Sequence, residues 1–174
     1  QVTEGMLPAL LKVDTNQAVR RYDHKLFGLC NDWPGVTRLT VFDGKAYEPG
    51  MKANPDYLTA LKGLQLPAVR MAGTDSQYFQ WKKALGSMTN REAQKNGQWG
   101  AAVPQPVGVV EWIASSRQLD PEAQFVWVFN MTSDTAQDAA DLAEFLTGSA
   151  DTVWGKKRIA LGLKAPVKPI VWEL

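Results

Sequence analysis

Polar side chains stand at or near the carboxyl ends of the strands predicted for this 174-residue sequence. In a parallel sheet these ends share one rim, and α/β proteins place their chemistry there. Each residue alone has an ordinary explanation, since an arginine after a strand commonly pairs with a carboxylate and an asparagine commonly caps the next helix. Together they favour a site for a polyhydroxylated ligand, whose hydroxyl groups need several fixed donors and acceptors. The residues are Asn31, Asp32, Arg70, Asn130 and Glu173.

Other chemistries have little support in the sequence. Neither G-x-G-x-x-G nor G-x-x-x-x-G-K-[ST] occurs, so no nucleotide site is predicted. The single histidine, His24, and the single cysteine, Cys30, argue against a zinc site or a Cys/His nucleophile. Ser115 and Ser116 lack the glycines of a nucleophile elbow. We therefore expect neither a metal nor a cofactor.

The composition excludes some partners. A net charge of +1, from 19 basic and 18 acidic residues, offers no electrostatic case for nucleic acid or an anionic membrane. The apolar runs are far shorter than the ~20 residues of a membrane span. No signal peptide is visible, but a mature secreted chain would look the same, and we expect a secreted or periplasmic location. The seven tryptophans fit either core packing or stacking against sugar rings.

The elements that must position the polar residues alternate along the chain. Apolar runs bounded by turn residues predict strands at residues 25–31, 65–71, 124–131 and 168–174. Capping signals and 3.6-residue periodicity predict helices at residues 55–64, 106–117 and 136–146, and residues 158–162 are expected to be a connector. Residues 8–22 are expected to form a strand or short hairpin within an amino-terminal extension, residues 1–23.

This alternation predicts an α/β fold with a parallel sheet. Four strands and three helices are compatible with an open sheet of flavodoxin type. They are equally compatible with the first half of an eight-stranded barrel, which typically needs about 250 residues. The long loop at residues 72–103 is rich in aromatic residues, and loops of this length are usually functional.

Several short motifs occur in an order that resembles a known family. Residues 25–32 are similar to a first-strand motif F-G-x-x-x-E, with Asp32 in place of the glutamate. Residues 69–75 are similar to R-x-P-G-G-N: Arg70 and Gly73 match, whereas Ala72, Thr74 and Asp75 differ. Further similar stretches follow at residues 78–81, 129–130 and 147–160, and residues 172–174 resemble the start of W-E-[ILV]-G-N-E.

In this order, the motifs resemble the amino-terminal half of a retaining clan-A (β/α)8-barrel glycoside hydrolase. The likeness is greatest to family 51 α-L-arabinofuranosidases. The resemblance implies that residues 24–174 are the first half of a TIM barrel, truncated after strand 4. It also implies retaining double displacement on arabinofuranosides of plant cell-wall polysaccharide. The partners implied are an oligo- or polysaccharide and the missing carboxyl-terminal half of the barrel.

The family motif places the general acid/base just past Leu174 and the nucleophile on a later strand. The resemblance therefore implies no catalytic residue within this chain, which alone is expected to be inactive. Trp33 and Trp99 are additional candidate stacking platforms. The substrate-binding residues implied are Asp32, Arg70, Asp75, Trp81, Asn130 and Glu173.

Two other functions remain open. One is a non-catalytic carbohydrate-binding α/β module, and the other is a flavodoxin-like regulatory or cofactor domain, which has less support because no phosphate-cradling loop is present. The departures at Asp32, Thr74 and Asp75 leave the sugar undetermined, and related barrels cleave xylosides, glucuronides and galactosides.

Overall fold

A computed structural model describes residues 10–17, 20–21, 28–32, 41–63, 68–72, 74–95, 101–167 and 170–173. Its main sheet is parallel and follows the order β1-β2-β5-β6, so each of these strands lies beside the next one along the chain. This order lacks the reversal of a flavodoxin-type sheet. The strands are β1 (Leu29–Asp32), β2 (Ala68–Ala72), β5 (Gln124–Val128) and β6 (Ile170–Glu173).

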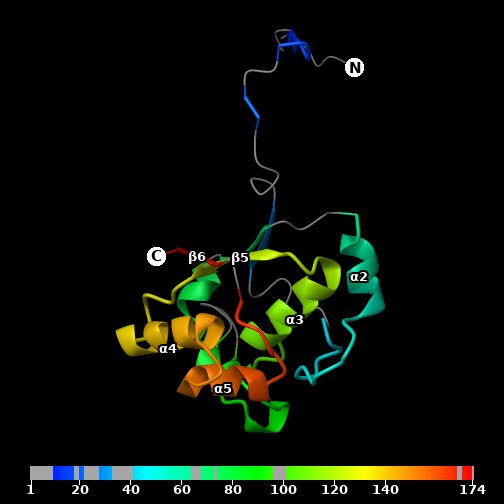
Figure 1. Cartoon of the computed structure of the whole chain (residues 1–174). Helices are drawn as coiled ribbons and strands as arrows, with labels where there is room; N and C mark the ends of the chain where they lie inside the picture. The colour runs from blue at the N-terminus through cyan, green and yellow to red at the C-terminus, as the bar shows by residue number, and fades with distance from the viewer. Residues whose placement is uncertain are drawn as a thin grey trace.

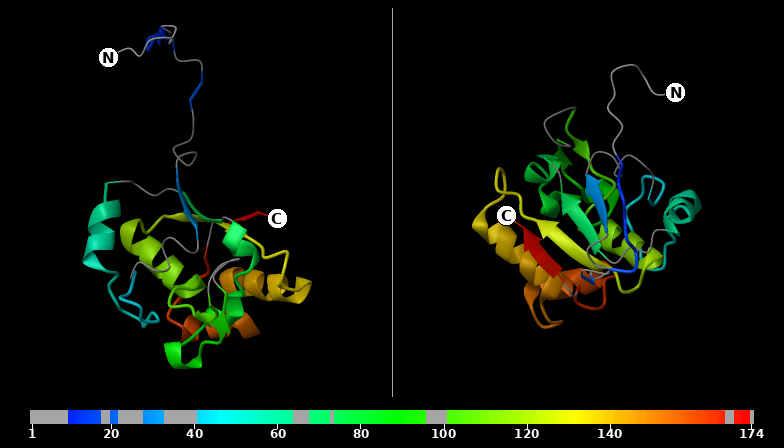
Figure 2. Two further views of the ribbon diagram at one scale, coloured as in Figure 1. Left: turned by 180° about the vertical axis from the view of Figure 1, so that it is seen from behind. Right: turned by 90° about the horizontal axis from the view of Figure 1, so that it is seen from above.

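The connecting helices pack on the sheet, and together they form a two-layered, mixed α/β structure. They are α2 (Pro55–Leu61), α3 (Val109–Leu119), α4 (Ala136–Thr147) and α5 (Val153–Ala160). Helices α3, α4 and α5 lie against one face of the sheet (Figure 1), and the view from above shows the strands in front of them (Figure 2). On the other face, the side chains of Arg70 and Val171 are accessible to solvent.

The core between the two layers follows from period-2 alternation along the strands. Val69 and Met71 of β2 and Phe125 and Trp127 of β5 are buried against the helices. Consecutive side chains of a strand point to opposite faces, so Arg70 and Val126 occupy the face that the helices do not cover. The apolar sides of α3 and α4 complete the core, which contains Val109, Trp112, Ile113, Leu142, Phe145 and Leu146.

The helix caps show where the sequence pattern was sufficient and where it was not. The start predicted for the helix at residue 55 is confirmed, because Asn54 caps it: its Oδ1 accepts hydrogen bonds from the backbone N–H groups of Asp56 (2.8 Å) and Tyr57 (3.4 Å). The predicted connector at residues 158–162 is wrong in part. Residues up to Ala160 belong to α5, which is capped by Thr152 through a 3.0 Å bond from the Gly155 N–H.

The amino-terminal prediction is also wrong for the residues described. Residues 10–17 and 20–21 contain no strand. They contain a turn in which Asp14 accepts a hydrogen bond from the Asn16 N–H through its Oδ1 atom at 3.0 Å. Aspartate favours such turns because its side-chain oxygen accepts from the N–H two residues on, as a backbone carbonyl does in a turn.

The expected long loop at residues 72–103 contains short elements of its own. Three 3₁₀ helices are followed by an antiparallel pair of two-residue strands, β3 (Ala93–Gln94) and β4 (Val103–Pro104). The 3₁₀ helices are η2 (Thr74–Gln77), η3 (Trp81–Ala84) and η4 (Met88–Asn90). The segment after β2 is therefore held in place where it approaches the carboxyl ends of the strands.

Candidate functional site

The centre of the candidate site is an ion pair between residues of β2 and β6 at the carboxyl rim of the sheet. The Arg70 Nε atom of β2 donates a hydrogen bond to Glu173 Oε2 of β6 at 2.7 Å, and its Nη2 atom donates to Oε1. The side chains of Arg70 and Glu173 are 41% and 37% exposed. They meet across β5, which lies between their strands. A bidentate pair of this kind fixes the direction of both groups and leaves them accessible to a ligand.

The charge state of Glu173 follows from this geometry. Hydrogen bonds from the Arg70 guanidinium, aided by its positive charge and opposed by slight desolvation, hold the pKa of Glu173 below its ordinary value. Glu173 is therefore ionised at neutral pH and acts as a hydrogen-bond acceptor. A general acid needs a proton to give, so this carboxylate is suited to binding and orientation.

Two more of the predicted site residues lie at the same end of the sheet. The backbone register pairs Asp32, the last residue of β1, with Ala72, the last residue of β2. Asp75 belongs to η2, which begins two residues after β2 ends. The structure thus brings Asp32, Arg70, Asp75 and Glu173 to one rim at the backbone level. The candidate platforms Trp33 and Trp99 lie outside the described residues.

Asn130 is nearby, but its hydrogen-bonding groups are occupied. Its Nδ2 atom donates to Phe79 O at 3.2 Å and Ser133 Oγ at 2.6 Å. Its Oδ1 atom accepts from the N–H groups of Thr132 (3.1 Å) and Ser133 (2.9 Å). A primary amide offers two donors and commonly two acceptor positions, so no capacity remains for a sugar. The structure supports a role for Asn130 in shaping the loop after β5 and does not support direct substrate binding.

The structure also does not support Trp81 as a stacking platform. Its side chain is 2% exposed, and its ring packs against Phe145 and Trp154 with centroids 5.5 and 5.0 Å away. Its indole N–H donates to Asp138 O at 3.1 Å. Composition could not distinguish this core tryptophan from one that contacts a sugar.

A different aromatic pair adjoins Glu173 along the chain and packs against the core, on the side of the sheet that the helices cover. Phe129 and Trp172 are stacked, with ring centroids 4.7 Å apart and an interplanar angle of 10°. The Phe129 N–H donates to Glu173 O at 3.0 Å, which fixes this pair relative to the carboxylate. The sequence signal for it was the pair of aromatic residues in adjacent strands, one residue after β5 and one before Glu173.

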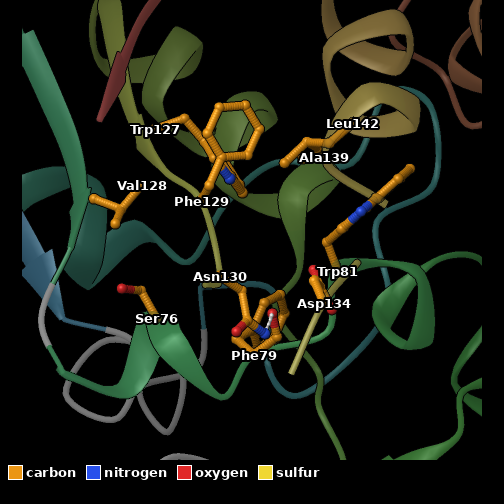
Figure 3. A pocket seen from close by; sticks show the side chains of 10 residues that line it. All are labelled: Ser76, Phe79, Trp81, Trp127, Val128, Phe129, Asn130, Asp134, Ala139 and Leu142. Carbon is orange, nitrogen blue, oxygen red and sulfur yellow. Dashed lines mark hydrogen bonds between the residues drawn. The ribbon is translucent and has the colours of Figure 1, made fainter. Parts of the chain in front are cut away.

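Behind the rim is a small cavity with a volume of about 20 Å³, shown in Figure 3. This volume suits one water molecule and is far too small for a sugar. Its walls come from β5, the loop that follows, α4 and the segment after β2. They comprise Ser76, Phe79, Trp81, Trp127, Val128, Phe129, Asn130, Asp134, Ala139 and Leu142.

The wall residue Asp134 gives a prediction about pH. Partial burial, together with the negative charge of Asp138, raises the pKa of Asp134 to about 6. The folded state then holds this proton more tightly than the unfolded state, so stability falls as pH rises from about 4 to about 6. We expect the free energy of unfolding to fall by about 1 kcal/mol over this range, after allowance for the partial exposure of the carboxyl group. Asp134→Asn should remove this fall. Urea unfolding at pH 4, 5, 6 and 7 measures it.

Asp138 provides the contrasting control. Hydrogen bonds from Lys82 and from the Thr135 side chain and backbone lower the pKa of Asp138 to about 2. The stability from this group is present above about pH 4 and is lost as pH falls toward 2. Asp138→Asn should therefore change the unfolding curve below pH 4, and it should also reduce the fall in stability between pH 4 and 6, because it removes a negative charge that raises the pKa of Asp134. If the free energy of unfolding depends on pH equally between pH 4 and 6 in Asp134→Asn and in the unsubstituted chain, this would contradict the assignment of the fall to Asp134.

Metal binding and membrane insertion are two further possibilities for the part of the chain that the structure describes. No cluster of three or more histidine, cysteine, aspartate or glutamate side chains there is arranged to hold a metal ion. None of the described helices combines the length and the apolar character needed to cross a membrane.

Comparison with known proteins gives consistent results. An intracellular exo-α-(1→5)-L-arabinofuranosidase of Acetivibrio thermocellus is 25% identical over 177 residues, which cover 97% of this chain and 34% of the relative. A probable α-L-arabinofuranosidase C of Aspergillus niger is 26% identical over 138 residues, which cover 75% of this chain and 27% of that protein. The chain thus spans about a third or less of the length of these curated relatives.

Solved structures show the same fold. A thermostable GH51 α-L-arabinofuranosidase from Thermotoga petrophila matches with a TM-score of 0.73 and 20% identity, over 91% of this chain and 33% of the other. The GH51 arabinofuranosidase from Xanthomonas axonopodis matches with a TM-score of 0.69 and 20% identity, over 85% and 31% of the two chains.

The comparisons correct one expectation. A secreted or periplasmic location was expected from the sequence, but relatives from Acetivibrio thermocellus, Halalkalibacterium halodurans and Bifidobacterium longum are each named as intracellular enzymes. The absence of a visible signal peptide is compatible with the loss of one, but these names contradict a secreted or periplasmic location.

The family assignment comes from the carboxyl-terminal two-thirds of the chain. The family model described as the alpha-L-arabinofuranosidase 1 domain matches residues 60–174, which include β2, β5, β6 and both members of the Arg70–Glu173 pair. This chain therefore belongs to the α-L-arabinofuranosidase 1 domain family.

Proposed function

We propose that residues 24–174 form the amino-terminal half of the (β/α)8 catalytic barrel of a retaining glycoside hydrolase, with residues 1–23 as an extension. The observation that carries this proposal is the Arg70–Glu173 pair at the carboxyl rim of a parallel sheet whose strands follow chain order. Sequential order with helices on one face is the arrangement of a (β/α)8 barrel, whose active site lies at this rim. Membership of the arabinofuranosidase family supports the same assignment.

The reaction we propose for the intact enzyme is double displacement. One carboxylate attacks the anomeric carbon while a carboxylic acid protonates the leaving oxygen, and water then hydrolyses the glycosyl-enzyme intermediate. These two carboxyl groups would lie beyond residue 174, roughly 5 Å apart. In this chain, Arg70 and Glu173 would bind sugar hydroxyls, and the positive charge of Arg70 would help to keep the nucleophile ionised.

The substrate class we propose is arabinofuranosides of plant cell-wall polysaccharides, with Asp32 and Asp75 as further hydroxyl ligands at the rim. The printed names of the relatives support the arabinofuranoside part of this proposal. Asp32 stands where the family motif has a glutamate, and its shorter side chain would reach less far into the site.

The test is hydrolysis of aryl glycosides by the product of the complete gene. We expect the α-L-arabinofuranoside to be cleaved with a kcat/KM about 10² or more above those of the xyloside, glucuronide and galactoside, because a site built for specific hydroxyls rejects other patterns. Proton NMR should show a first-formed sugar of unchanged anomeric configuration. The control is a protein of residues 1–174, which should not hydrolyse any of them.

Two results would contradict the proposal. Inversion at the anomeric carbon would exclude the retaining mechanism. Binding of arabino-oligosaccharides without hydrolysis of any glycoside in the panel would favour the non-catalytic carbohydrate-binding module.

A further inference from the structure

Gln77 connects two loops of the rim through one side-chain amide. It is the last residue of η2, in the segment after β2. Its Oε1 atom accepts a hydrogen bond from the Met131 N–H at 2.8 Å, and its Nε2 atom donates to Phe129 O at 3.2 Å. The amide thus pairs with a C=O and an N–H two residues apart, as a neighbouring β-strand would.

Other contacts join the same two loops. The Asn130 side chain donates in the opposite direction, to Phe79 O at 3.2 Å. The Gln80 Nε2 atom donates to Ser133 O at 3.4 Å. Residues 77–80 and 129–133 therefore form one hydrogen-bonded unit beside the Arg70–Glu173 pair.

This unit is anchored to buried glutamines. The Gln94 side chain binds both backbone groups of Gln80, accepting from its N–H at 2.8 Å and donating to its O at 3.3 Å. Gln105 donates in turn to Gln94 O at 3.2 Å, and Gln94 and Gln105 are both buried. A buried amide that lost its partners would carry a large desolvation penalty, so these bonds hold Gln80 firmly. Gln77 therefore belongs to a hydrogen-bonded unit that is held in place at Gln80.

Met131 is the residue whose backbone this hydrogen-bonded unit holds in place. Met131 is 65% exposed, although its backbone N–H is bound by Gln77. Val128, the register partner of Glu173, is three residues away along the chain, so the Cα atom of Met131 is at most about 10 Å from that of Val128. A single exposed apolar side chain is ordinary. Met131 differs, because its backbone is fixed beside the proposed sugar site. Its side chain is therefore placed to contact a bound sugar.

We propose that Gln77 is a positioning residue that holds Met131 at the rim as an apolar contact for the sugar unit next to the one bound by Arg70 and Glu173. This inference rests on the proposed function and extends it to a preference for oligosaccharides. A thioether is polarizable and adaptable, and it covers the C–H face of a sugar without competing for its hydroxyl groups.

The test compares two glutamines in the product of the complete gene. Gln118 makes the same pair of bonds as Gln77, accepting from the Ala53 N–H at 2.9 Å and donating to Met51 O at 3.0 Å, and it is also half-buried. It supports a different loop, residues 51–53, before α2. Gln77→Met and Gln118→Met therefore each remove one equivalent clamp and keep a side chain of similar length.

We expect Gln77→Met and Met131→Ala to raise KM for an arabino-oligosaccharide about tenfold, because a small displacement of a binding group weakens the complex. Their kcat values on the aryl arabinofuranoside should change by less than about twofold, because the lost contact contributes equally to the ground state and the transition state. Gln118→Met should leave both constants unchanged. Hydrogen exchange of the Met131 amide should accelerate in Gln77→Met and not in Gln118→Met.

Equal KM values for Gln77→Met and Gln118→Met, or an unchanged KM in Met131→Ala, would overturn the inference while the proposed function stands. Gln77→Glu guards against misfolding, because it keeps the acceptor for the Met131 N–H and replaces the donor to Phe129 O by a second acceptor oxygen. Its KM should lie between those of the unsubstituted enzyme and Gln77→Met, and a KM equal to that of Gln77→Met would assign the effect to Phe129. If the unsubstituted enzyme hydrolyses none of the glycosides, the proposed function itself fails.

Discussion

Replacing Arg91 by methionine is expected to lower the free energy of unfolding by about 3–5 kcal/mol, because it leaves a buried carboxylate unpaired. Arg91 and Glu111 each have 1% exposed side chains, and the Arg91 Nη2 atom lies 2.7 Å from Glu111 Oε1. The guanidinium also donates to Gly86 O and Gln105 O, so it ties the loop before β3 to the start of α3. Urea unfolding of the chain measures the loss.

The matched control is Lys82→Met, which removes a cation from a more accessible pair. Lys82 contacts Asp138 and Asp141, and its side chain is 33% exposed. Solvent screens such pairs, so the expected loss is about 1 kcal/mol or less. Equal losses in Lys82→Met and Arg91→Met would contradict the importance we assign to burial.

Removing both charges tests the mechanism of the loss. In Arg91→Met with Glu111→Leu neither charge of this pair is left buried, and stability should recover in part. Full recovery is not expected. Glu111 also accepts hydrogen bonds from the Tyr47 N–H at 2.7 Å and the Gly108 N–H at 2.8 Å, and leucine leaves both donors without this acceptor.

The strands could be predicted because their signal is local. Each strand of the main sheet overlaps an apolar run of the sequence, and the caps at Asn54 and Thr135 mark the starts of two helices. Helix α5 was missed because Lys156, Lys157 and Arg158 gave its short sequence a polar character. Arg158 is nevertheless buried, and its guanidinium donates to three backbone carbonyls from other turns of the chain. Such partners are supplied by tertiary structure and leave no local pattern.

The same distinction applies to the candidate site. Arg70 and Glu173 are 103 positions apart, yet the expectation that polar strand ends share a rim was enough to bring them together. Asn130 is predicted from its place at a strand end and Trp81 from the family resemblance, and the structure shows that hydrogen bonding occupies the first and core packing the second. The glutamine clamps carry no sequence signal, because glutamine is an ordinary loop residue until its partners are known.

Replacing Arg70 by methionine should lower kcat/KM of the complete gene product on an aryl arabinofuranoside by about 10²–10³, the usual cost of losing one preorganised donor from an active site. The guanidinium both orients Glu173 and supplies positive charge at the rim. Arg70→Lys should recover only part of this loss, because an ammonium group keeps the charge but cannot form the bidentate pair. Melting temperatures should change little, since both members of the pair are partly exposed to solvent.

Lys82→Met again provides the control, since it breaks a partly exposed ion pair on η3 and leaves Arg70 and Glu173 intact. Its kcat/KM should remain within about twofold of that of the unsubstituted enzyme, as expected for a substitution outside the site. A second comparison uses Glu173→Gln, which keeps the shape of the side chain and removes its charge. If Arg70 acts chiefly by orienting Glu173, then Glu173→Gln and Arg70→Met should cause similar losses, and the double variant should lose little more than either. A kcat/KM in Arg70→Met equal to that of Lys82→Met would contradict the placement of the sugar site at this rim.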